Sequence, residues 1–242
     1  MKPFLLLATR AEDEAADNEY DAILAYAGLD ESRLRRHRLE RDPLGHVDLD
    51  HWAGIIVGGG PFNVSDPAES KGAVQVRVEA ETQALLDEVV ARDFPFFGAC
   101  YGIGALGVRD GGAVDRTYGE PVGAVKIELT DEGRADPLFG VLPDYFDAFL
   151  GHKEGISRMP RSAVVLASSA TCPVQALRFG NNVYATQFHP ELDSDGLCTR
   201  VDVYQHYGYF DPSEAEGLKA MAAAATVTEP ERLLEGFVGL FG

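Results

Sequence analysis

The sequence predicts a three-layer α/β sandwich with a mostly parallel central sheet, a smaller antiparallel portion and a helical C-terminal tail. In the first half, short continuous apolar runs alternate with longer segments of helical periodicity, which is typical of parallel strands covered by helices on both faces. In the second half, short apolar runs follow one another closely, and this spacing favours antiparallel strands.

The elements of the first half follow from their apolar spacing. Compact apolar runs predict three buried strands, at Phe4–Ala8, Gly54–Val57 and Phe94–Ala99. Apolar residues at helical spacing predict three helices, at Glu14–Ala27, Val76–Arg92 and Tyr101–Val108. Each strand is followed by a helix, as a parallel sheet requires.

The second half contains five predicted strands and then three predicted helices. The strands are Val122–Leu129, Asp147–Leu150, Ala163–Ser168, Val174–Arg178 and Val183–Phe188. The helices are Leu197–His206, Pro212–Ala225 and Pro230–Phe241. We therefore expect one domain over residues 1–192, and a helical C-terminal extension over residues 193–242 that packs on the same domain.

Composition narrows the classes of function. The chain of 242 residues carries 21 Lys and Arg against 39 Asp and Glu, a net charge of −18. Such an acidic chain repels phosphate backbones and anionic membranes, so we expect neither nucleic acid nor membrane as a partner. Three cysteines without CxxC spacing disfavour a disulfide scaffold, and the first apolar run is too short for a secretion signal. The sequence predicts a cytoplasmic protein.

Cys100 is the candidate nucleophile. It follows the apolar run Phe94–Ala99, and Gly98 and Gly102 flank it on either side. A buried strand that turns sharply into a helix, with glycines around the turn residue, is the arrangement that exposes a nucleophile in Gly-x-Ser-x-Gly hydrolases. The start of the helix is also expected to favour the thiolate. The alternative is a buried structural cysteine.

His189 and Glu191 are the candidate base and its orienting carboxylate. They follow the apolar strand that begins at Val183, within Gln187-Phe188-His189-Pro190-Glu191. A thiol needs a base that draws off its proton, and an imidazole held by a carboxylate suits this role near neutral pH. The alternative is a surface histidine beside an exposed glutamate.

A glycine-rich turn follows the strand Gly54–Val57. Gly58, Gly59 and Gly60 precede Pro61, and their bare backbone amides are suited to stabilising a developing negative charge. A plain turn is the alternative. No Gly-Lys-Ser/Thr follows, so the segment does not match a phosphate-binding P-loop.

Together these three segments resemble the class I, triad-type glutamine amidotransferases. The shared pattern is Gly59-Gly60-Pro61, then Gly98–Gly102, then Gln187–Glu191, in this order. The resemblance covers about residues 1–192 and is greatest to the GMP-synthase-glutaminase-like branch, to which Leu150–Glu154 and Cys172–Ala176 are also similar. It implies a flavodoxin-like sheet, and we take Cys172 as structural.

The resemblance also implies a mechanism without a cofactor. Cys100, His189 and Glu191 would form the catalytic triad, with Cys100 attacking the side-chain amide of glutamine to give a γ-glutamyl thioester. Oxyanion and substrate-binding roles would fall to Gly59, Gly60, Tyr101, Gly104, His152 and Lys153. The backbone amides of Gly60 and Tyr101 are the expected oxyanion donors.

Two positions depart from the family pattern. Many members carry Gln four residues after the cysteine, where this chain has Gly104, and synthetase-linked members have a small Gly where this chain has Lys153. Lys153 either binds a substrate carboxylate or is solvated at the rim. The two changes affect the expected substrate specificity and leave the catalytic triad intact.

Three functions therefore stay open. The chain is a glutaminase that supplies ammonia to a separate synthetase partner, a free-standing hydrolase of γ-glutamyl peptides or amides, or a non-catalytic regulatory module. No synthetase module fits within residues 192–242, and association into a homodimer is left open. His46, Asp48, Asp50 and His51 have no defensible metal-ligand spacing, and we expect a hydrated loop there and no metal.

Overall fold

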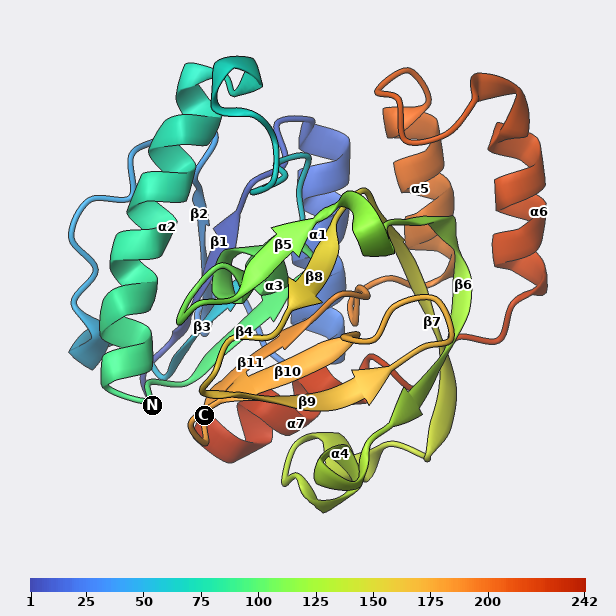
Figure 1. Ribbon diagram of the computed structural model, residues 1–242. Coiled ribbons are helices and arrows are strands. Elements are labelled where there is room, and N and C mark those ends of the chain that lie inside the picture. The colour runs from blue at the N-terminus through green and yellow to red at the C-terminus, as the bar shows by residue number, and fades with distance from the viewer.

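A nine-stranded sheet runs through the centre of the protein (Figure 1). The computed structural model describes residues 1–242. In spatial order the strands are β2 (Leu34–Arg38), β1 (Phe4–Ala8), β3 (Gly54–Val57), β4 (Phe96–Ala99), β11 (Val183–Thr186), β10 (Ala176–Phe179), β9 (Ala163–Ser168), β6 (Glu120–Leu129) and β7 (Tyr145–His152). A separate two-stranded sheet pairs β5 (Ala113–Asp115) with β8 (Gly155–Arg158).

The sheet changes character at β11. Strands β2, β1, β3, β4 and β11 pair in parallel, in the order 2-1-3-4-5 of a flavodoxin-like sheet. From β11 to β7 every pairing is antiparallel. This arrangement confirms the predicted α/β class with a mostly parallel sheet and an antiparallel portion.

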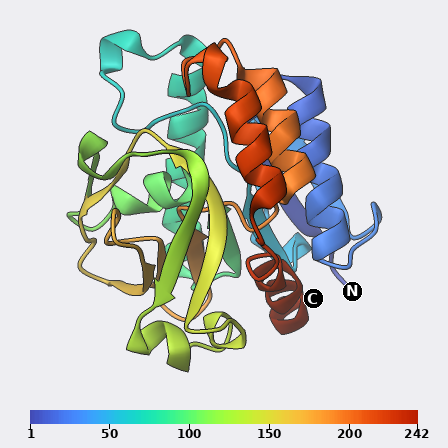
Figure 2. The same ribbon diagram turned by 90° about the vertical axis from the view of Figure 1, so that its right-hand side faces the viewer.

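Seven α-helices surround the sheet. They are α1 (Asp13–Tyr26), α2 (Ala73–Ala91), α3 (Tyr101–Gly107), α4 (Asp131–Ala135), α5 (Ser194–Tyr204), α6 (Ala215–Ala224) and α7 (Arg232–Phe241). Figure 2 shows α1, α5 and α6 side by side on one face, with α7 beyond the end of α6. Helices α2 and α3 pack on the opposite face. None of the helices combines the length and apolar character needed to cross a membrane.

Alternate residues of the parallel strands point to opposite faces of the sheet, and each face has its own hydrophobic core. On one face Phe4, Leu6 and Phe97 pack against α1 and α7, where Phe237 is fully buried. On the other face Leu5 and Leu7 pack against α2 and α3. This period of two explains why the strands appear in sequence as unbroken apolar runs, since both faces are buried.

The C-terminal helices contact the sheet at separate places. Helix α5 packs Leu197 and Val201 against Phe149 of β7, and α7 packs Leu234 and Phe237 into the core beneath β1. The chain termini consequently lie near one another in both views (Figures 1 and 2).

Strand β2 and the pair β5–β8 are absent from the sequence-based prediction. Strand β2 reads Leu-Arg-Arg-His-Arg, and only Leu34 is buried. It forms the edge of the sheet, where charged side chains reach solvent and pair with α1, as Arg36 does with Asp17 at 2.8 Å. An apolar run cannot be expected at such an edge.

Candidate active site

Cys100 lies on a strained turn between β4 and α3. Its φ and ψ of 49° and −86° place a non-glycine residue in a left-handed region that L side chains rarely adopt. The surrounding structure enforces this backbone: Cys100 N donates to Thr186 O at 2.8 Å, and a β-carbon at Gly98 would lie 2.8 Å from the Cα of Gly102. The flanking glycines therefore allow strand and helix to approach closely enough to form the turn.

His189 and Glu191 follow β11, next to β4 in the sheet. His189 Nδ1 lies 2.9 Å from Glu191 Oε1, and the backbone N–H of His189 donates to Phe149 O at 3.1 Å. Both side chains are buried. The backbone turns at Pro190, so that the carboxylate of Glu191 lies against the imidazole of His189.

The glycine turn after β3 supports the imidazole. A β-carbon at Gly59 would lie 2.3 Å from His189 Cε1, and one at Gly60 would lie 1.9 Å from Thr9 Oγ1. Thr9 Oγ1 in turn donates to Gly59 O at 3.0 Å. The turn is therefore packed between β1 and the histidine ring, with no room for larger side chains.

Two cavities meet at Cys100. One, of about 60 Å³, is lined by both Cys100 and His189, with Gly60 and an apolar wall from β6, β7 and α5. The other, of about 20 Å³, contains Tyr101 and Gly104 on the α3 side. The structure thus brings the sequence-predicted residues together at the carboxyl edge of the parallel strands, where ligands bind in open α/β sheets.

Burial dominates the protonation of the pair. It raises the pKa of the Cys100 thiol to about 12, with Glu154 and Glu191 adding to the rise and Arg10 and Arg200 opposing it. It lowers the pKa of His189 to about 4. Burial thus opposes the thiolate that the helix start is expected to favour.

A buried ion cluster behind His189 is the main feature that the sequence did not predict. Arg200 on α5 places Nη2 2.8 Å from Glu191 Oε1 and Nη1 3.1 Å from His189 Nδ1. Arg10, just after β1, places Nε 2.9 Å from Glu19 Oε1. Burial works to raise the pKa of Glu191, but His189 and Arg200 together hold it below its usual value.

Glu154 is a second residue that sequence reasoning missed. Its carboxylate is buried and accepts hydrogen bonds from Val64 N at 2.9 Å and Ser65 N at 2.8 Å. It lines the cavity on the α3 side, where its partners are backbone amides and no cationic side chain pairs with it. A signal was available, because an acidic residue directly follows the candidate pair His152-Lys153 in the sequence.

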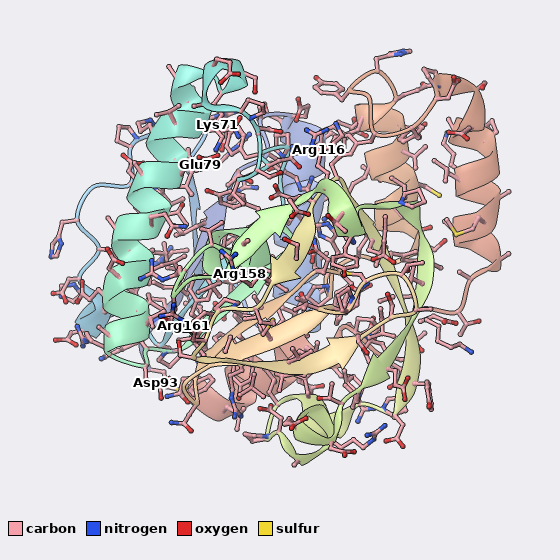
Figure 3. All side chains as sticks on the ribbon, in the orientation of Figure 1. Lys71, Glu79, Asp93, Arg116, Arg158 and Arg161 are labelled. Carbon is pink, nitrogen blue, oxygen red and sulfur yellow. The ribbon has the colours of Figure 1, made fainter.

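The loop that holds Glu154 is itself tied to α2. Lys71 Nζ donates to Val64 O at 2.9 Å and pairs with Glu79 Oε2 at 2.7 Å, and Figure 3 shows these two side chains at the start of α2. Gln75 Nε2 donates to Asn63 O at 3.0 Å. The peptide groups that present Val64 N and Ser65 N to Glu154 are thus held through their carbonyl oxygens by Lys71 and Gln75.

His152 and Lys153 lie beside the same cavity but are engaged with the protein. His152 Nδ1 lies 2.7 Å from Glu154 O and Nε2 lies 2.8 Å from Glu120 Oε2, so both ring nitrogens are occupied. Lys153 Nζ lies 4.6 Å from the centroid of the Tyr209 ring, a cation–π contact. Lys153 is thus neither free at the rim nor paired with an acidic side chain.

A cysteine on a strained strand–helix turn, with a histidine–carboxylate pair on the neighbouring strand, is typical of α/β enzymes with a nucleophile elbow. The chain belongs to the class-I glutamine amidotransferase family, whose model matches residues 27–197.

Similar proteins fall into two groups. Among curated relatives, the glutamine-hydrolysing GMP synthase of Thermosipho africanus is 29% identical over 62% of this chain, and one of the subunits of the corresponding enzyme of Thermoplasma acidophilum is 26% identical over 60% of it. The alignments span 26% and 66% of those relatives, respectively. Among solved structures, a glutamine amidotransferase from Thermotoga maritima has a TM-score of 0.72 at 19% identity, covering 98% of this chain and 99% of its own. That likeness shows a shared fold.

Proposed function

We propose that this protein hydrolyses the side-chain amide of glutamine through a γ-glutamyl thioester on Cys100. The observation that carries the proposal is the placement of Cys100 and His189 on one cavity, with Glu191 hydrogen-bonded to the far side of the imidazole. Family membership supports it.

The reaction divides into two balanced steps. His189 Nε2 takes the proton of Cys100 while the sulfur bonds to the amide carbon; the C–N bond then breaks and His189 returns the proton to the departing ammonia. Water, deprotonated by His189, attacks the thioester; the C–S bond breaks and the proton passes to Cys100. The products are ammonia and glutamate.

Backbone amides at Gly60 and Tyr101 suit the oxyanion of both steps. Gly60 lines both cavities, and Tyr101 begins α3, where the first N–H groups of a helix lack intrahelical acceptors. An oxyanion donor is worth about 2.7–4 kcal/mol of transition-state stabilisation.

Glu154 supports an amino-acid substrate. A buried carboxylate without a cationic partner is costly, and a ligand that brings an ammonium group removes that cost. The α-ammonium of glutamine meets this need in the α3-side cavity, within which Glu154 already accepts two backbone hydrogen bonds.

The free space on the His189 side bears on the size of the leaving group. The cavity on the His189 side, where the leaving group departs, has about 60 Å³ of free space. That volume holds a few small molecules such as water or ammonia, because each water needs about 10–15 Å³ on this scale. This space suits ammonia as the leaving group, and Tyr209 and Phe210 are among the residues that line it.

By similarity to relatives named as subunits of a glutamine-hydrolysing GMP synthase, the released ammonia serves a separate synthetase. A substrate panel tests the proposal: ammonia or amine release is measured with glutamine and with γ-glutamyl peptides. Cys198, a half-exposed cysteine on α5, gives the matched control. We expect Cys100→Ala to lose turnover by at least about 10³-fold and Cys198→Ala to keep it.

Two results would redirect the proposal. Preference for γ-glutamyl peptides over glutamine would assign the chain as a γ-glutamyl hydrolase. Wild-type turnover in Cys100→Ala would remove the thioester mechanism, and no turnover of any substrate, alone or with a synthetase, would favour a regulatory module.

A further inference from the structure

Four charged side chains lie together behind the candidate base. Arg10, Glu19, Glu191 and Arg200 are each at most 7% exposed. Arg200 bridges the two carboxylates, with Nη2 2.8 Å from Glu191 Oε1 and 3.7 Å from Glu19 Oε1. Arg10 pairs with Glu19 at 2.9 Å, and its Nη1 lies 3.3 Å from the hydroxyl of Tyr204.

The members of this cluster come from four separate segments. Arg10 follows β1, Glu19 lies on α1, Glu191 follows β11 and Arg200 lies on α5. Buried ion pairs contribute little net stability, because desolvation offsets the Coulombic attraction. A cluster that contacts the candidate base through two of its members therefore points to a role in the chemistry.

Geometry at His189 Nδ1 limits the protonation states. Glu191 Oε1 at 2.9 Å is an acceptor and requires a proton on Nδ1, whereas Arg200 Nη1 at 3.1 Å is a donor and requires Nδ1 to be bare. Both bonds cannot form at once. With the proton on Nδ1, Nε2 is free to accept from Cys100; with Nδ1 bare, Nε2 carries the proton and cannot act as the base.

Arg200 competes for Nδ1 through Nη1, but it supports the Nδ1-protonated state through Glu191. Its Nη2 donates to the same Oε1 that faces the imidazole, which keeps Glu191 ionised and fixes the oxygen in place. Ionised Glu191, whose Oε1 faces both Arg200 Nη2 and His189 Nδ1, favours the proton on Nδ1. The guanidinium also places a positive charge beside the ring and so disfavours the imidazolium.

We propose that Arg200 is a positioning residue that, through Glu191, holds His189 as the neutral tautomer with its proton on Nδ1, and that Glu19 and Arg10 hold Arg200 in place. The assignment rests on the proposed function, since it gives His189 the role of base toward Cys100. Arg200 lines the same cavity as Cys100, and its hydrogen bonds go to His189 and Glu191, not to Cys100.

The groups around His189 come from every element packed against it: Glu191 after β11, Arg200 and Tyr204 on α5, Arg10 after β1, Cys100 before α3 and Tyr209 after α5. Glu191 favours the imidazolium, while Arg200 and Arg10 oppose it. Removing the charge of Arg200 should therefore raise the pKa of His189 and move the acid limb of kcat/KM to higher pH.

Imidazole ¹⁵N NMR on the full chain provides the test, since it reports the tautomer and titration of His189 without turnover. The six histidine resonances are assigned with a His189→Gln variant. We expect the wild-type ring to carry its proton on Nδ1. In Arg200→Met we expect the pKa of His189 to rise by at least about one unit, with the same displacement of the acid limb of kcat/KM for glutamine.

The controls separate this role from a loss of folding. Arg200→Lys keeps the charge and should restore most of the wild-type titration. Arg178→Met removes another partly buried arginine, paired with Asp136, and should leave His189 unchanged. If Arg200→Met does not fold by circular dichroism, Arg200→Gln, which removes the charge but keeps a polar side chain, should raise the pKa of His189 in the same direction.

An unchanged titration of His189 in folded Arg200→Met would overturn the assignment. Failure of the proposed function is distinguished by its own signature: wild-type protein without glutamine turnover, but with a His189 ring that still responds to Arg200.

Discussion

Gly104 and Glu154 share one space beside the candidate nucleophile. A β-carbon at position 104 would lie 2.9 Å from Glu154 Oε1. The absence of a side chain on α3 thus lets the carboxylate enter the cavity that Cys100 lines. Glu154, 50 positions later in the chain, occupies the space that a side chain at position 104 would need.

Glu154→Gln should weaken recognition of the substrate ammonium. Hydrogen bonds to charged groups are worth about 1.5–3 kcal/mol, so we expect kcat/KM for glutamine to fall by about 10- to 100-fold. Glutaric acid monoamide, which lacks the ammonium, should be affected much less. Glu88→Gln, an exposed change on α2, serves as the control. Equal losses for both substrates would contradict an ammonium-binding role.

Gly59→Ala should displace the imidazole. The added methyl group would lie 2.3 Å from His189 Cε1, and a misplacement of about 1 Å costs about 100-fold in rate. Gly217→Ala on α6 is the matched control, because a β-carbon there meets nothing within 4 Å; it should add about 0.5–1 kcal/mol of stability. Steady-state kinetics and thermal unfolding of both variants check the pair, and undiminished turnover in Gly59→Ala would show that His189 is not fixed by this contact.

The acid limb of kcat/KM should lie well below the pH expected for an ordinary histidine. Burial lowers the pKa of His189 to about 4 from 6.5, and the base must be neutral to accept the proton of Cys100. Activity is therefore retained as pH falls through 6.5 and is lost only as pH approaches about 4. Initial rates across this range, with recovery assayed at about pH 7 to exclude unfolding, provide the measurement. A limb centred near 6.5 would show a solvated ring.

Phe237→Ala should strongly destabilise the protein. Phe237 is fully buried and packs against Phe4 and Phe97, at ring-centroid distances of 5.9 and 5.7 Å. Truncation of a buried phenylalanine costs about 3–5 kcal/mol of unfolding free energy. Phe241→Ala, a partly exposed neighbour on α7, should cost much less. Urea denaturation measures both, and equal losses would mean that α7 does not dock through Phe237.

Much of the fold was predictable because burial leaves a direct pattern in the sequence. Strands β1, β3 and β9 begin and end where their apolar runs do. Strand β2 could not be predicted in this way, since it is rich in arginine, and Arg36 and Arg38 pair with acidic side chains of α1. Strand β8 has only two buried residues and contributes too few apolar positions to be distinguished from a loop.

The candidate site shows a similar division. Cys100, His189 and Glu191 occur in compact local motifs. In the structure Cys100 and His189 line one cavity, and Glu191 is hydrogen-bonded to His189. Arg10 and Arg200 lie 190 positions apart and meet only in the folded protein. The residues next to Arg200 in the sequence do not indicate its partners. Sequence spacing therefore does not distinguish an arginine in a buried ion pair from one that is solvated.

The order of these segments along the chain has a consequence for biosynthesis. Cys100 and the glycine turn emerge from the ribosome well before His189, and Arg200 emerges later still. The thiol would therefore have no base while the first half of the sheet folds, and α7 closes the core only after α5 has appeared. A nascent or truncated chain that lacks His189 and Arg200 should therefore release no ammonia.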